Sequence, residues 1–143
     1  WTPGPQSPRL EYPIDLFEAG EFELQVILSP TLDYRGDGGL RYAVSIDDAP
    51  PQVVNVHAGT TDAHWDRAGA DNRWVRTTRH RVAQAGAHVV RLWAVDPGLI
   101  FQRLVLTRAP LPPTYLGPPE SLRADSPPDL HGSLPSFIVT RRR

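Results

Sequence analysis

Two stretches of alternating residues decide the fold: residues 21–29, EFELQVILS, and residues 40–47, LRYAVSID. In the first stretch every second side chain is apolar: Phe22, Leu24, Val26 and Leu28. The second stretch repeats the pattern with Leu40, Tyr42, Val44 and Ile46. Successive side chains of a strand point to opposite faces, so this period of two predicts two half-buried β-strands.

Turn-forming residues separate these stretches from further short strands. Residues 33–39, DYRGDGG, contain the residue types that tolerate positive φ and predict the loop between the first two strands. More strands are expected at residues 53–56, 74–82, 89–95 and 99–106, with turns at 85–87 and 96–98. Residues 58–74 predict a long loop, and no stretch has a convincing amphipathic-helix pattern. The fold expected is all-β, an antiparallel β-sandwich.

Composition limits the size and the partners of the chain. With 143 residues, 40% of them hydrophobic, the chain suits one domain with its own core. The 15 basic and 16 acidic residues are spread along the sequence, so no basic face is expected for nucleic acid. No apolar run approaches the roughly 20 residues of a membrane helix, which argues against a membrane partner.

Prolines and terminal residues suggest how the chain is organised. Four prolines near the N-terminus predict a linker at residues 1–11, followed by a sandwich at 12–121 and a loosely ordered tail rich in Pro, Ser and Arg at 122–143. The chain has no Met and begins at Trp1, so we expect it to come from a longer protein. It also lacks Cys, which excludes disulfides, thiolate catalysis and cysteine zinc sites.

Several short strings in one order carry a resemblance to a known family. They are residues 29–32 (SPTL), 41–48 (RYAVSIDD), 93–98 (WAVDPG) and 115–121 (YLGPPES), with Trp65, Asn72, His80, Gly86 and His88 between them. Together they resemble the C-terminal domain of glycoside hydrolase family 115, from about Tyr12 to Ser121. The resemblance implies a galactose-binding-like jelly roll and a parent α-glucuronidase acting on xylan, secreted or periplasmic and commonly homodimeric.

The chain itself is expected to be non-catalytic. Glycoside hydrolysis needs two carboxyl groups about 5–10 Å apart across a cleft. The neighbours Asp47 and Asp48 would point to opposite faces of a strand, or cap the turn after it. The five histidines, His57, His64, His80, His88 and His131, show no spacing that pairs with a nucleophilic Ser or clusters metal ligands.

No cofactor is expected, although a structural calcium ion deserves a test. Galactose-binding-like sandwiches often hold calcium near their first and last strands, and residues 17–22, FEAGEF, look like the first part of such a site. In the last strand, however, residues 101–103, FQR, offer only a neutral Gln oxygen where an acidic ligand would be expected. A hard cation binds more weakly to such a set, so calcium is not favoured.

Sugar binding needs an aromatic plane with polar side chains at its rim. The candidates are Trp65, Asn72, Arg73 and Tyr115. Trp65 in the polar segment 62–67 is either a plug over the sandwich edge or an exposed platform, and Tyr115 could stack on a sugar or clamp the C-terminal segment. Trp93, in a regular strand, is expected to belong to the core.

Two functions therefore remain open. The first is a non-catalytic accessory domain that binds xylan or glucuronoxylan. The alternative is a structural or dimerisation module that packs on the catalytic domains of the parent enzyme without binding sugar, with Leu111, Leu116 and Phe137 as the apolar residues of its surface.

Overall fold

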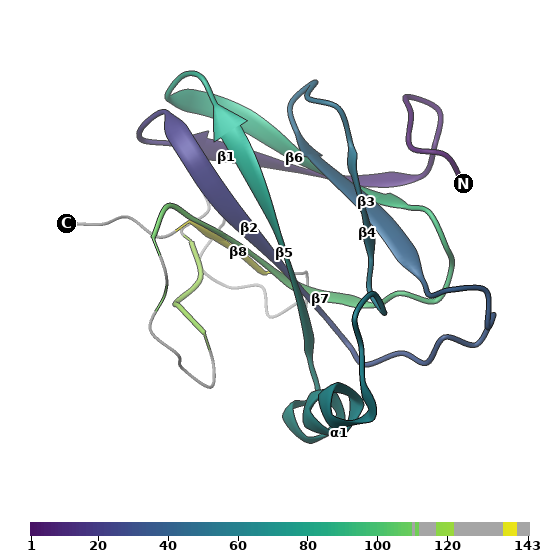
Figure 1. The fold of residues 1–143 in the computed structure, drawn as a ribbon. Coiled ribbons are helices and arrows are strands. Elements are labelled where there is room, and N and C mark those ends of the chain that lie inside the picture. The colour runs from purple at the N-terminus through teal and green to yellow at the C-terminus, as the bar shows by residue number, and fades with distance from the viewer. Residues whose placement is uncertain (110, 112–116, 122–135, 140–143) are drawn as a thin grey trace, which may run out of the picture.

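Two four-stranded sheets pack against each other in the computed structural model, which describes residues 1–109, 111, 117–121 and 136–139 (Figure 1). The first sheet has the order β1 (Arg9–Leu16), β6 (Gly86–Ala94), β3 (Arg41–Ile46), β4 (Gln52–Asn55). The second has the order β5 (Trp74–Val82), β2 (Gly20–Leu28), β7 (Phe101–Thr107), β8 (Ser136–Val139). All pairings are antiparallel except that of β7 with β8. The predicted all-β sandwich is confirmed.

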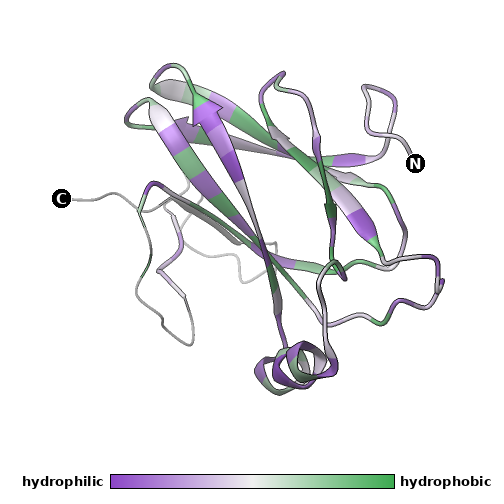
Figure 2. Cartoon of the chain, viewed as in Figure 1, coloured by the Kyte–Doolittle hydropathy of each residue, from purple (hydrophilic) through white to green (hydrophobic). Residues whose placement is uncertain are grey.

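The alternating residues fill the space between the sheets. Phe22, Leu24, Val26 and Leu28 of β2 are all buried, and so are Tyr42, Val44 and Ile46 of β3. The alternation is visible as green and purple bands along β2 in Figure 2. Facing side chains of the two sheets form one apolar core, as expected of a sandwich.

A second, smaller cluster lies on the outer face of the first sheet. Trp93, 6% exposed, packs there with Ala43 and Val95. Its Nε1 atom donates a hydrogen bond to the carbonyl oxygen of Gly4 at 3.1 Å, and the amino group of Trp1 donates to Val95 at 2.8 Å. Trp93 is therefore buried as predicted, but beneath the N-terminal segment and outside the central core.

Strand β1 corrects the predicted linker. It begins at Arg9 and pairs with β6 along its whole length, so residues 9–11 belong to the sheet. Pro13 stands inside this strand opposite Val89. Because β1 is an edge strand, a proline that cannot donate a hydrogen bond is tolerated there.

Helix α1, Asp62–Asp71, corrects the prediction of a loop at residues 58–74. The Thr61 hydroxyl caps its N-terminus by accepting from the backbone N–H of His64, and the His64 side chain accepts from the Thr61 N–H in return. Asn72 ends the helix in the left-handed conformation with φ 49°. Two caps thus hold a helix that has only one fully buried residue, Ala68.

The helix closes one end of the sandwich (Figure 1). It connects β4 to β5, and the loops that connect β2 to β3 and β6 to β7 lie at this same end. Beside the helix, the Arg76 side chain of β5 donates to the carbonyl oxygen of Val56 at 2.9 Å. Gln52 of β4 donates to the carbonyl oxygen of Arg79 at 2.8 Å. These bonds join an edge of one sheet to an edge of the other.

The C-terminal region is described only in part. Strand β8 falls within the predicted tail and includes Phe137. Leu116 and the site candidate Tyr115 lie outside the described residues. Within the part of the chain that the structure describes, no helix is long and apolar enough to cross a membrane.

Candidate functional site: a cationic groove beside the helix

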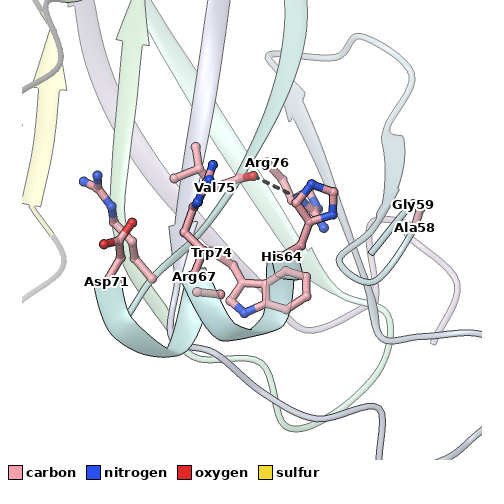
Figure 3. A pocket seen from close by; sticks show the side chains of 10 residues that line it. Ala58, Gly59, His64, Arg67, Asp71, Trp74, Val75 and Arg76 are labelled. Atoms are coloured by element: carbon pink, nitrogen blue, oxygen red, sulfur yellow. Dashed lines mark hydrogen bonds between the residues drawn. The ribbon is translucent and has the colours of Figure 1, made fainter. Parts of the chain in front are cut away.

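A groove of about 290 Å³ runs between α1 and the start of β5 (Figure 3). The helix supplies His64, Arg67 and Asp71, and the chain from its C-terminal end into β5 supplies Arg73, Trp74 and Arg76. Ala58 and Gly59, in the turn before the helix, line the groove as well. The site is therefore built by one helix, its preceding turn and one strand.

Trp74 anchors the groove to the core. This residue is 4% exposed, and its ring lies 6.0 Å from the Trp65 ring and 5.4 Å from the His57 ring, measured between centroids. The Arg76 guanidinium carbon lies 5.0 Å from the Trp74 centroid, within reach of a cation–π interaction. Aromatic packing thus fixes the position of a cation at the groove.

Arg76 is half-buried, and its hydrogen-bond partners are all neutral. Nε donates to the carbonyl oxygen of Val56 at 2.9 Å, Nη1 to that of Val75 at 3.2 Å, and Nη2 to the Thr60 hydroxyl at 3.4 Å. Burial lowers the pKa of Arg76 below its usual value because it penalises the charged form. The guanidinium therefore brings positive charge to the groove without a carboxylate of its own.

The groove carries an excess of positive charge. Arg67, Arg73 and Arg76 line it together with a single carboxylate, that of Asp71. None of these three arginines forms an ion pair with any described residue, whereas other arginines of the domain do. Such an arrangement can attract and hold an anionic group.

The structure gathers three of the four predicted sugar-binding residues at the helix and its C-terminal end. Arg73 lines the groove. Trp65 does not, but it is half-buried and packs against the core beside Trp74. Asn72 is exposed, and its carbonyl oxygen accepts a hydrogen bond from Gln102 at 3.1 Å.

Sequence reasoning missed Arg67 and Arg76 as site residues. The sequence pattern around Arg76 could have identified it. Alternate residues of β5 face inward, and Arg76 is one of them, together with Trp74, Thr78, His80 and Val82. An Arg in an otherwise inward series must reach polar partners at the sandwich edge. Arg67 had no such signal, since the segment around it was expected to be a loop.

Asp96, outside the groove, is engaged in structural contacts. Asp96, 4% exposed, accepts from the Arg41 backbone N–H at 2.9 Å and from the Arg41 Nε at 2.8 Å. The hydrogen bond from Arg41 lowers the pKa of Asp96 below its usual value. These bonds attach the β6–β7 turn to the beginning of β3.

The two stretches considered for calcium lie at opposite ends of the sandwich. Glu18, near the first strand, pairs with Arg108 at 2.5 Å beyond the end of β7. Gln102, at the start of β7, instead donates to the Ser29 hydroxyl at 2.9 Å. Among the residues described, no three His, Asp or Glu side chains come close enough to form a metal site.

Comparisons with known proteins point to one family. A family model, the glycosyl hydrolase family 115 C-terminal domain, matches residues 2–120. The chain is similar to the solved structure of a family GH115 4-O-methyl-alpha-glucuronidase with specificity for decorated arabinogalactans, with a TM-score of 0.60 and 24% identity. The match covers 66% of this chain and 12% of that enzyme's chain, so this chain spans a small part of the enzyme. No curated protein matches the chain.

Proposed function

The chain belongs to the family of glycosyl hydrolase family 115 C-terminal domains, and from this premise we propose that it is a non-catalytic accessory domain that binds glucuronoxylan-type polysaccharide. The binding site is the groove between α1 and β5. The observation that carries the proposal is the set of arginines along this groove beside a polar helix and an aromatic anchor.

The size and chemistry of the groove suit a short stretch of sugar. Its volume of about 290 Å³ is near the lower end of the usual range for ligand sites, roughly 300–1,000 Å³. Arg67, Arg73 and Asp71 offer donors and acceptors for hydroxyl groups. Ala58 and Val75 add apolar surface for the C–H groups of a sugar ring.

The carboxylates favour a non-catalytic role. Only Asp71 among the described acidic residues lines the groove, whereas glycoside hydrolysis uses a pair of carboxyl groups. Asp47, Asp96 and Glu18 are held by a histidine or by arginines at other places. Catalysis by the parent α-glucuronidase is accordingly assigned to its other domains, and secretion or export to the periplasm would bring the enzyme to its polysaccharide.

Affinity electrophoresis tests the proposal directly. The chain should be retarded in gels that contain soluble glucuronoxylan. A gel with decorated arabinogalactan shows whether the specificity of the similar enzyme extends to this domain. Ala58→Leu, which fills the groove with a branched apolar side chain, should abolish the retardation. Ala83→Leu, at an exposed position between β5 and β6, is the matched control.

A second candidate function is a packing or dimerisation module, and an exposed apolar patch favours it. Leu32, Tyr34 and Ile100 are all exposed at the end of the sandwich that carries α1. Their two loops are joined by bonds from Tyr34 to Pro97 at 3.0 Å and from Ser29 to Ile100 at 2.9 Å. A dimer in size-exclusion chromatography with no retardation by either polysaccharide would support this function and contradict the first.

A further inference from the structure

We propose that the groove recognises the carboxylate of a uronic acid unit, held by the guanidinium groups of Arg67 and Arg73, and this inference rests on the proposed sugar-binding function. It goes further by assigning the binding energy to the charged branch of the polysaccharide. A domain that held only the neutral backbone would need no cluster of cations.

The first argument is the balance of charge within the groove. Three arginines and one acidic residue, Asp71, line the groove, and none of the three arginines is in an ion pair with a described residue. Elsewhere in the domain Arg41 pairs with Asp96 and Arg108 pairs with Glu18, whereas Arg79 and Arg81, exposed on β5, form no ion pair with a described residue. The hollow of the surface is thus lined by cations that have no counter-ion among the described residues.

The second argument comes from Arg76. Its charge is half-buried against Trp74 and satisfied only by neutral oxygens. Burial of a charge without a counter-charge is unfavourable, and an anion in the groove would offset this penalty. Arg76 therefore raises the affinity of the groove for an anion even though its own donors are already used.

The third argument is the match between guanidinium and carboxylate. Arg presents a planar set of donors that can engage both oxygens of a carboxylate, and these charge-assisted bonds are stronger than bonds to hydroxyl groups. Arg67 and Arg73 come from different elements, the helix and the segment after it, and both line the groove. A carboxylate that enters the groove would meet donors from two sides.

The shape of the charge distribution favours a single anionic sugar over an extended polyanion. The whole chain has a net charge of −1, and the exposed Arg79 and Arg81 of β5 stand opposite Glu23 and Glu21 of β2. Phosphate backbones and highly charged polymers bind along continuous basic faces. A confined group of cations suits an isolated charge, such as the glucuronosyl unit on which the similar enzyme acts.

Isothermal titration with matched oligosaccharides tests the inference. The probes are a xylo-oligosaccharide with one 4-O-methylglucuronosyl branch, the same compound with its carboxyl group reduced to an alcohol, and the unbranched xylo-oligosaccharide. Loss of charge-assisted bonds should weaken binding about tenfold or more, so the acidic compound should bind at least that much more tightly than the reduced one.

Single variants then assign the effect to the groove. Arg67→Gln and Arg73→Gln should each remove most of the difference between the acidic and the reduced probe. Arg81→Gln changes an exposed arginine of β5 that does not line the groove, so it should leave the difference unchanged. Arg76 is not chosen because its side chain also joins the two sheets. Thermal melts of all variants establish that they are folded.

The outcomes separate the inference from the function beneath it. Equal binding of the acidic and reduced probes would overturn carboxylate recognition and leave sugar binding intact. A preference for the acidic probe that survives both Arg67→Gln and Arg73→Gln would also overturn it, because the carboxylate would then bind elsewhere. Absence of binding by all three probes would overturn the sugar-binding function together with the inference, and would favour a protein surface as the partner of these arginines.

Discussion

The Oδ2 atom of Asp47 lies 2.7 Å from Nδ1 of His88, and this pair holds the end of β3 against β6. The other oxygen of Asp47 accepts from the Val89 backbone N–H at 2.9 Å. The next residue, Asp48, is 99% exposed at its side chain and pairs with Arg91 at 3.1 Å. The two neighbouring carboxylates therefore diverge and make structural contacts at the strand end.

The pair of Asp47 and His88 should make stability depend on pH. The hydrogen bond that His88 donates to Asp47 raises the pKa of His88 above 6.5, against the effect of burial. Burial raises the pKa of Asp47, but the bonds from His88 and Val89 outweigh this and leave it below 3.8. The pair contributes its full stabilisation at pH values between the ordinary pKa values of 3.8 and 6.5. This stabilisation is lost as the pH rises through the folded pKa of His88 or falls through that of Asp47.

Asp47→Asn tests this pair. The free energy of unfolding of the unmutated chain should fall as the pH rises above about 6.5, and the variant should lose part of this slope because the pKa of His88 returns toward its usual value. Urea denaturation at several pH values is the measurement. An unchanged slope in Asp47→Asn would show that the pair contributes nothing to the pH dependence.

His80 should act in the opposite direction. It is buried between the sheets, where Nε2 lies 2.8 Å from the Thr78 hydroxyl, and burial lowers its pKa below 6.5. The unfolded chain then binds a proton more readily than the folded one, so stability should fall as the pH drops below about 6.5. His80→Gln should flatten this acidic limb while Asp47→Asn leaves it unchanged. The same urea denaturation series, extended to about pH 5, separates the two histidines.

Trp93→Ala should destabilise the domain by about 3 kcal/mol. The estimate is at the lower end for a buried Trp, because the N-terminal segment that covers Trp93 can collapse into part of the space left behind. Trp93→Phe keeps a ring but loses the bond to Gly4, and should cost about 1 kcal/mol. Chemical denaturation measures both. If the two variants are equally stable, the ring does not contribute through burial.

The strands were predictable because their pattern is local. The alternation from Phe22 to Leu28 and the proline and glycine near the turn at 96–98 predict β2, β7 and the turn within a few residues. Strand β1 was not predicted because Pro13 argues against a strand. An edge strand tolerates proline, but the sequence does not show which strand lies at the edge. Helix α1 was not predicted because it lacks the usual apolar stripe of an amphipathic helix. Its ends are held by the caps Thr61 and Asn72.

The sequence predicted the place of the candidate site better than it predicted the residues that line it. Arg73 was expected at a sugar-binding site and lies in the groove. Arg67 and His64 became groove residues only because residues 62–71 form a helix, which brings side chains three positions apart to one face. This arrangement depends on how α1 packs against Trp74. No periodic pattern in the sequence predicts that packing.

Trp65→Ala distinguishes the two roles considered for this residue. A solvent-exposed platform would leave the melting temperature unchanged and remove a stacking contact with the ligand. Trp65 is instead half-buried against the core, 6.0 Å from the Trp74 ring between centroids, and it does not line the groove. We therefore expect Trp65→Ala to destabilise the domain by about 1–2 kcal/mol, less than a fully buried Trp.

The effect of Trp65→Ala on binding should be indirect. Trp74 supports Arg76 at the groove, so loss of its neighbour should weaken polysaccharide binding by less than about tenfold, below the loss expected for a direct stacking contact. Trp65→Phe, which keeps a ring beside Trp74, should restore most of the stability and most of the affinity. Thermal melts and titrations with glucuronoxylan on the two variants provide both readings. An unchanged melting temperature with affinity lost in Trp65→Ala would instead establish Trp65 as a platform that contacts the sugar itself.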